Sequence, residues 1–544
     1  MSRPVPRTRS VLVSAVLRRS ALSLAVTTTV LVSACSSDGG AGGASTPRVG
    51  GTLTFAVSSD AGCVDPQQES SGDTVLALRQ TVDSLTDQDP TSGKIVPWLA
   101  RAWEVSPDAR TFTFHLRPGV TFSDGAPVDA RAVKANFDAI PRLGELAIQA
   151  EGYLSGYAGT TVVDDLTARV AFTQPNVQFL QATSTSVLGL VAPSSAAKSA
   201  QQRCRGIVGS GPFVLHTYSQ NQSIELTRRA GYAWGSSRWT KPGEAYLQRL
   251  VFRVVPESGV RTGSLRSGQV DAIGRIGRAE EAALTGTDVR LLTYTIPGVG
   301  YTLGFNNSRP LLTDAAVRRA IMTGVDRQQI VDTVFPKGTP PATSILAKST
   351  PGYVDLSSDL RFDPAAAKAA LDRDGWRAGS DGIRQKNGTR LRLSGVWFAN
   401  AAIYRPAVEL IQQQLRAIGV DLALRELQVA QFPQVLKSGD FDVLWGGNYN
   451  RADPDALRTL FSSRLVNAYR LPPGDLDQVL ATQAGETNET RRTAEVGQAQ
   501  RLIVRNAYVV PVVDQQTEIG VSAKVHDTRF GTAGDVQLHD AWVG

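Results

Sequence analysis

The side chains best suited to chemistry in this chain stand at the ends of predicted strands, and they are aromatic, amide and charged groups. The richest set follows the predicted strand 440–445 and comprises Trp445, Asn448, Tyr449, Asn450, Arg451 and Asp453. Further candidates at strand ends are Trp397, Asn400, Tyr404, Asn306 and Asp65. Ligands of open α/β sheets bind beyond the carboxyl ends of strands, so these residues form the candidate ligand-binding set.

Each candidate also has a purely structural interpretation. The two tryptophans suit packing between elements as well as they suit ligand stacking. Asn448 and Asn450 suit a turn, because asparagine tolerates the left-handed conformation. Arg451 has two aspartates close by in the sequence as ion-pair partners, and Asp65 precedes a proline in a predicted turn.

Sequence motifs of common catalytic sites are missing from the chain. There is no HExxH, GxSxG, phosphate-loop or CxxC motif, and the histidines are scattered, at His115, His216, His526 and His539. Their spacing is not that of a metal site. The sequence therefore gives no sign of an enzyme, a metal site or another cofactor, and a lipid-anchored hydrolase is the remote alternative.

The candidate residues need a scaffold, and the sequence indicates an α/β one. Predicted strands at 50–57, 250–255 and 420–424 alternate with helices such as 402–418. Such alternation is typical of α/β folds. The 544-residue chain is too long for one hydrophobic core, so we expect more than one domain.

The stretch 97–137 is the most specific part of the sequence. Period-two alternation predicts a half-buried strand at 111–116, a turn follows at 123–125, and Asp129 is placed to cap a helix predicted from Val128. Its residue string includes Pro97-Trp98-Leu99-Ala100, Arg117-Pro118-Gly119-Val120 and Phe122-Ser123-Asp124-Gly125. This string resembles the signature of the family 5 extracellular solute-binding proteins, the peptide, oligopeptide and nickel-type binding components of bacterial ABC importers.

The resemblance implies an α/β fold with two lobes, similar to periplasmic binding proteins of type II in the large three-subdomain variant, with two hinge strands. Lobe I is expected over 48–75, 206–300 and 509–544, with a small subdomain over 76–205. Lobe II is expected over 301–508. The strands at 301–307 and 509–513 are expected to cross between the lobes, which would close on a ligand by hinge motion.

The resemblance also implies a ligand class. In peptide-binding members, the loop that matches 445–455 places an aspartate against the ammonium group of the ligand. Here that position falls on Asn448 or Asn450, and losing one charged hydrogen bond costs about 10- to 100-fold in affinity. Capture of di- or oligopeptides for an ABC permease and ATPase is the main hypothesis. An oligosaccharide or other polar solute, and a lipid-anchored sensor without transport, are the alternatives.

The N-terminal segment predicts export. Residues 1–34 hold five arginines and no acidic residue, and their apolar run 21–34 is too short for a membrane span, which is typical of a signal peptide. Val32-Ser33-Ala34-Cys35 resembles a lipobox, so we expect a lipoprotein signal peptide over 1–34, lipid on Cys35 and a flexible tether over 35–47. We expect an extracytoplasmic monomer anchored to the cell membrane.

The charge of the chain gives no basis for nucleic-acid binding. The net charge is +7, and removing the five leader arginines leaves about +2.

The resemblance also implies a pairing of the two remaining cysteines. Cys63 follows the first strand of lobe I, and Cys204 precedes the return of the family chain to that lobe. Because such a pair is oxidised outside the cytoplasm, we expect a disulfide, with two unpaired buried thiols as the alternative.

Overall fold

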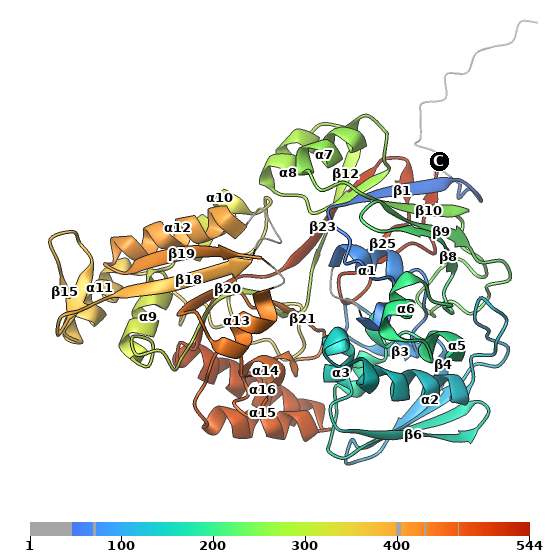
Figure 1. Cartoon of the computed structure of the whole chain (residues 1–544), viewed down its shortest axis with the longest axis horizontal. Coiled ribbons are helices and arrows are strands. Elements are labelled where there is room, and N and C mark those ends of the chain that lie inside the picture. The colour runs from blue at the N-terminus through green and yellow to red at the C-terminus, as the bar shows by residue number, and fades with distance from the viewer. Residues whose placement is uncertain (1–45, 69–71, 399–403, 429–430, 466) are drawn as a thin grey trace, which may run out of the picture. The chain divides into compact units, whose positions relative to one another are not determined.

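The computed structural model describes residues 46–68, 72–398, 404–428, 431–465 and 467–544, and within it Pro47–Gly544 forms one unit. Three sheets organise this unit (Figure 1). We call the part built on the seven-stranded sheet lobe I, the part built on the four-stranded sheet its small subdomain, and the part built on the five-stranded sheet lobe II. The predicted leader lies outside the described residues.

Lobe I is centred on β1. The sheet order is β12 (Val289–Thr295), β23 (Gln516–Ser522), β11 (Ala272–Gly274), β1 (Thr52–Val57), β10 (Arg249–Val254), β9 (Ser223–Arg228) and β8 (Phe213–Ser219). Leu53 and Phe55 are buried in the same apolar cluster as side chains of α1 (Gly72–Leu78). Ala56 belongs to a second cluster with residues of α7 (Ser258–Arg266) and α8 (Arg278–Leu284). The two-residue period along β1 thus supplies both faces of the sheet.

The small subdomain contains the stretch that is most specific in sequence. Its sheet order is β4 (Ala100–Val105), β5 (Thr111–Leu116), β7 (Thr167–Phe172) and β6 (Tyr157–Asp164). The predicted strand at 111–116 is confirmed, and Phe112, Phe114 and Leu116 are buried. Helix α2 (Ala130–Ala139) begins two residues later than predicted. Asp129 caps it as expected, because its carboxylate accepts from the Ala132 amide at 2.8 Å.

The remaining elements of lobe I and its small subdomain are short. They are α3 (Ile148–Tyr153), α4 (Phe179–Ala182), α5 (Pro193–Ala196), α6 (Ala200–Arg205), β2 (Thr86–Gln88), β3 (Ile95–Pro97), β24 (Val525–His526), β25 (Arg529–Phe530), β26 (Val536–Gln537) and β27 (Trp542–Val543). The expected disulfide is present between Cys63 and Cys204, with the two sulfur atoms 2.02 Å apart. It joins α6 to the segment that follows β1.

Lobe II has helices on both faces of its sheet. The sheet order is β19 (Asp421–Leu427), β18 (Arg392–Phe398), β20 (Val443–Gly446), β14 (Tyr301–Phe305) and β22 (Val509–Val513). One face packs against α9 (Ala315–Gly324), α10 (Arg327–Val334), α11 (Pro364–Arg373) and α12 (Tyr404–Ala417). The other packs against α13 (Phe432–Ser438), α14 (Ala456–Phe461), α15 (Asp475–Gly485) and α16 (Glu489–Arg505), the last three drawn together in red in Figure 1.

The crossings between the lobes differ from the expectation. Strand β22 pairs with β14 in the five-stranded sheet, so both strands belong to lobe II. The chain crosses at 296–300 and again at 514–515, before β23 enters the seven-stranded sheet. Lobe I therefore resumes after Val513 and not at 509. Strand β22 is an edge strand, which is the place where a sheet tolerates Pro511.

Candidate functional site

Both crossings contact the loop 446–455, which carries most of the predicted site. In the first crossing, β13 (Gly298–Val299) pairs with β21 (Tyr449–Asn450). Gly298 has φ +113°, and a Cβ there would lie 2.1 Å from the Tyr449 carbonyl oxygen, so only glycine permits this pairing. In the return crossing, Gln515 Oε1 accepts a hydrogen bond from Asn448 Nδ2 at 2.8 Å. The loop is therefore held against both hinge segments.

An aromatic cluster lies beside this loop, where β14 begins and β20 ends. The rings of Tyr301 and Trp445 stack with centroids 6.2 Å apart, and the Tyr404 ring lies 5.3 Å from Tyr301 and 6.3 Å from Trp445. All three side chains are buried. Burial raises the pKa of the Tyr404 hydroxyl well above its usual value. The cluster packs the start of β14 against the end of β20 and presents two tyrosines on the hinge side of lobe II.

A charged network of lobe I acts on these tyrosines. Arg275 follows β11, and its Nε donates to the Asp73 carboxylate at 2.8 Å. Asp73 also accepts hydrogen bonds from the hydroxyls of Ser58 and Ser59. Burial raises the pKa of Asp73, but the charge of Arg275 and the serine hydrogen bonds outweigh it, so the pKa is lowered. Tyr301 and Tyr404 both interact electrostatically with Arg275, which links the two lobes.

Arg451 forms a second link between the lobes, and it does so without a carboxylate. Its Nη1 donates to Gln178 Oε1 in the small subdomain at 2.8 Å, and its guanidinium carbon lies 4.0 Å from the centre of the Tyr153 ring. Its Nη2 donates to the Tyr449 hydroxyl at 2.6 Å. The alternative in which Arg451 pairs with a nearby aspartate is wrong in the described part of the chain, because Asp453 and Asp455 have other partners.

Those two aspartates are occupied by arginines of lobe II. Asp453 accepts from Arg492 at 2.6 and 2.9 Å, and Asp455 accepts from Arg458 at 2.7 Å. Both carboxylates are buried. Burial alone would raise the pKa of Asp453, but the charge and hydrogen bonds of Arg492 outweigh burial. The pKa of Asp453 is therefore lowered, and the carboxylate remains charged and paired. Neither aspartate is thus open to replace the ammonium-binding carboxylate that the loop lacks.

The other predicted site residues are placed apart from this loop or outside the described residues. Asp65 and Arg203 form a fully buried ion pair beside the disulfide, with Nε 2.7 Å from Oδ2. Asn306 lies at the far end of β14, where it donates to the Gly439 carbonyl oxygen. Trp397 is buried, and the guanidinium carbon of Arg405 lies 5.6 Å from its ring centre. Asn400 is outside the described residues.

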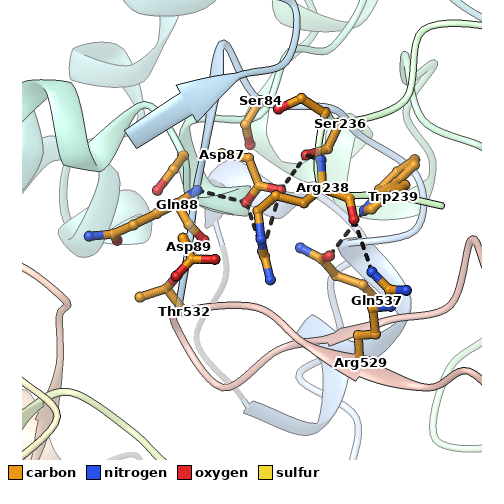
Figure 2. Close-up of polar contacts among 12 residues, drawn as sticks. Ser84, Asp87, Gln88, Asp89, Ser236, Arg238, Trp239, Arg529, Thr532 and Gln537 are labelled. Atoms are coloured by element: carbon orange, nitrogen blue, oxygen red, sulfur yellow. Dashed lines mark hydrogen bonds and ion pairs between the residues drawn. The ribbon is translucent and has the colours of Figure 1, made fainter. Parts of the chain in front are cut away.

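Polar contacts elsewhere in lobe I serve packing. Figure 2 shows Asp87 with Ser236 and Arg238, and Trp239 donating to Gln537 Oε1 at 3.0 Å. The contacts join the C-terminal segment to β2. Within the described ranges, no three His, Cys, Asp or Glu side chains are grouped as a metal ion would need, and no helix there is both long and apolar enough to cross a membrane.

Two residues of the site escaped the sequence analysis. Arg275 stands directly after β11, so applying the strand-end rule to Ala272–Gly274 would have found it. The strand-end rule missed Tyr301, because this residue begins a strand and does not end one. It faces the site because β14 runs antiparallel to β20, which brings the start of one strand to the end of the other.

Comparisons with known proteins agree on one family. The family model "Bacterial extracellular solute-binding proteins, family 5 Middle" matches residues 94–467. The nickel-binding periplasmic protein of Escherichia coli (strain K12) is 27% identical over 429 residues, covering 74% of this chain and 78% of that protein. The di/tripeptide-binding protein 1 of Pseudomonas aeruginosa is 22% identical, covering 88% of this chain and 92% of that protein.

Solved structures show the same fold. NikA from Brucella suis in complex with Fe(III)-EDTA superposes with a TM-score of 0.79 at 23% identity, covering 91% of this chain and 100% of that chain. DppA from Helicobacter pylori in complex with the peptide STSA gives a TM-score of 0.75 at 20% identity, covering 91% of this chain and 98% of that chain. The expected two-lobed α/β fold is therefore confirmed.

Proposed function

Because the chain belongs to the family 5 bacterial extracellular solute-binding proteins, we propose that it captures peptides and delivers them to an ABC importer. Members of this family are extracytoplasmic substrate-binding components of importers and not enzymes. Peptide capture is favoured by relatives such as the di/tripeptide-binding protein of Pseudomonas aeruginosa, which matches most of the chain.

The observation that carries the proposal is the attachment of the loop 446–455 to both crossings. Asn448 is bonded to one crossing and Tyr449 is paired with the other, while Arg275 of lobe I acts on Tyr301 and Tyr404. A ligand that contacts this loop and Arg275 would touch both lobes at once. Such a ligand favours the closed arrangement, because only there does it make both sets of contacts.

A peptide would be held mainly through its main chain, in the manner of an added strand, which tolerates varied side chains. Micromolar affinity, about −8 kcal/mol, is sufficient for capture. A second candidate is another polar solute, such as an oligosaccharide. It is favoured by the amide of Asn448 in the loop that carries an ammonium-binding aspartate in peptide-binding members, and by the pairing of Asp453 with Arg492.

Native mass spectrometry tests the proposed function. The chain purified without residues 1–35 should carry a ladder of co-purified peptide masses, which disappears after unfolding, dialysis and refolding. Incubation with a di- and tripeptide mixture should then restore bound masses. Hexose-spaced masses in the purified protein, or no peptide capture from the mixture, would reject the peptide proposal.

Anchoring through a lipid on Cys35 is part of the proposal. A diacylated cysteine would keep the binding protein beside its permease, and residues 35–47 would give it reach. The variant Cys35→Ser, expressed in full length, should lose partition into the detergent phase of a Triton X-114 extract, whereas the unaltered chain should partition there. Equal partition of the two proteins would contradict lipidation at this residue.

A further inference from the structure

We propose that Arg275 binds a carboxylate of the ligand, which makes this a site for anionic or zwitterionic solutes oriented by their acidic group. The inference deepens the proposed function and rests on it for the location of the ligand. The inference starts from a difference between the Nε atom of Arg275 and its two Nη atoms. One edge of Arg275 is anchored within lobe I, and among the described residues the two Nη atoms have no hydrogen-bond acceptor.

The anchored edge is well defined. Arg275 Nε donates to Asp73, a buried carboxylate that two serine hydroxyls also bind. In the described part of the chain, neither Nη atom of Arg275 donates a hydrogen bond, and 43% of the side chain is exposed. A guanidinium group held through Nε offers its two Nη atoms side by side, which is the geometry that binds both oxygens of a carboxylate.

The backbone at this position is also unusual. Arg275 has φ +59°, in the left-handed region that a side chain other than glycine seldom adopts. Arg261, a buried residue of α7, bonds the Arg275 carbonyl oxygen at 3.5 Å and also bonds the carbonyl oxygens of Val255 and Pro256. A strained arginine that its surroundings hold in place indicates a functional constraint.

The charged groups near Arg275 include a second arginine. Arg261 interacts with Arg275 and with the carboxylates of Asp73, Glu280 and Glu257, whereas Asp73 is the carboxylate that acts on Arg275. Across from Arg275 stand the hydroxyl groups of Tyr301 and Tyr404 in lobe II, which suit the same oxygens as donors. The aspartates near the loop 446–455 are already paired with Arg458 and Arg492, so they do not compete for Arg275.

The proposed site therefore binds an acidic group of the ligand through a cation, whereas a site that recognises an ammonium group binds a basic group through a carboxylate. The loop offers the amide of Asn448 or Asn450 where a carboxylate would be needed, whereas lobe I offers a guanidinium. For a peptide, the C-terminal carboxylate would therefore fix the orientation, and blocking the N-terminus would matter little. A non-peptide ligand would need a carboxylate in the same place.

The test uses a matched pair of small probes, 3-phenylpropionate and 3-phenylpropanamide, with dissociation constants measured by ligand-observed NMR on the chain without residues 1–35. The acid should bind at least about 10-fold more tightly than the amide, as expected for charged hydrogen bonds. Arg275→Gln should remove this preference, and Arg275→Lys should keep part of it. Thermal unfolding of each variant checks that it is folded.

Arg249→Gln is the matched control. Arg249 also lies in lobe I, is also 43% exposed and also pairs with a carboxylate, that of Glu225, so its loss should leave the preference for the acid unchanged. Equal affinity for acid and amide, no binding of the acid, or an equal loss for both probes in Arg275→Gln would overturn the assignment. If the acid is preferred through Arg275 but no peptide binds, the peptide proposal fails and the carboxylate site stands.

Discussion

Lobe I contains two arginine–aspartate pairs whose surroundings differ sharply. Arg203 and Asp65 are completely buried beside the disulfide, and Arg203 also bonds Gln67. In the second pair, Asp73 is buried but Arg275 is 43% exposed. The first pair is closed to any ligand, whereas the second keeps donor atoms available. The same two residue types thus serve stability in one place and recognition in the other, and burial distinguishes the roles.

The largest expected effect on stability separates these pairs. Arg203→Ala leaves the Asp65 carboxylate buried without its partner, so we expect a loss of about 3–5 kcal/mol in the free energy of unfolding. Arg275→Ala should cost less, about 1–2 kcal/mol, because its ion pair is partly solvated and Asp73 keeps the hydrogen bonds from Ser58 and Ser59. Urea unfolding curves measure both values. Similar losses for the two variants would break the comparison.

Loss of the disulfide should lower the free energy of unfolding by as much as Arg203→Ala does, or by less. Cys63→Ser together with Cys204→Ser opens a loop of 141 residues, and the loss should be about 2–5 kcal/mol. Because the disulfide lies beside Arg203 and not beside Arg275, the acid-over-amide preference of the folded variant should be unchanged. A lost preference in a variant that still unfolds cooperatively would show that the two regions are coupled.

The decline of stability with rising pH should come partly from Asp514 in the return crossing and not from Asp73. Burial raises the pKa of Asp514, in the return crossing, to about 7. A carboxyl whose folded pKa is raised binds a proton more tightly in the folded state, so its contribution to stability is lost as pH rises from about 4 to about 7. The pKa of Asp73 is lowered, so its contribution is lost only as pH falls below the usual range.

Urea unfolding between pH 4.5 and 8 checks whether the free energy of unfolding falls as pH rises. One such group changes the free energy of unfolding by at most about 1.4 kcal/mol per pH unit. Asp514→Asn should make the decline with rising pH shallower without abolishing it, because Asp83 and Glu518 also have pKa values raised to about 7. A slope unchanged by the substitution would mean that Asp514 is not protonated in the folded protein.

The smallest expected effect concerns Asn448 in the loop 446–455. Asn448→Asp adds a carboxylate near Gln515 at the return crossing, and it should strengthen binding of peptides with a free N-terminus by about 10-fold if a ligand ammonium group reaches this loop. N-acetylated peptides serve as the control and should gain nothing. Isothermal titration at constant pH measures the difference. Equal gains or equal losses for both peptide forms would exclude a direct contact with the ammonium group.

The sequence predicted local elements well and the site only partly. Strand 111–116, the Asp129 cap and the Cys63–Cys204 disulfide were all anticipated, the first two because their signals are local in the chain. Asp65 illustrates the limit. A turn aspartate after a strand looks the same in sequence whether it faces a ligand or, as here, a buried arginine 138 residues away.

What the sequence determined by itself was the family, the α/β fold and a binding role, because the string 97–137 and the alternation of strands and helices are read along the chain. What only the tertiary structure decided was the charge of the site. Arg492 reaches Asp453 from 39 residues along the chain, and a strained turn carries Arg275 toward the tyrosines of lobe II. The physical reason is that ion pairing and burial depend on distances in space, which separation along the chain does not specify.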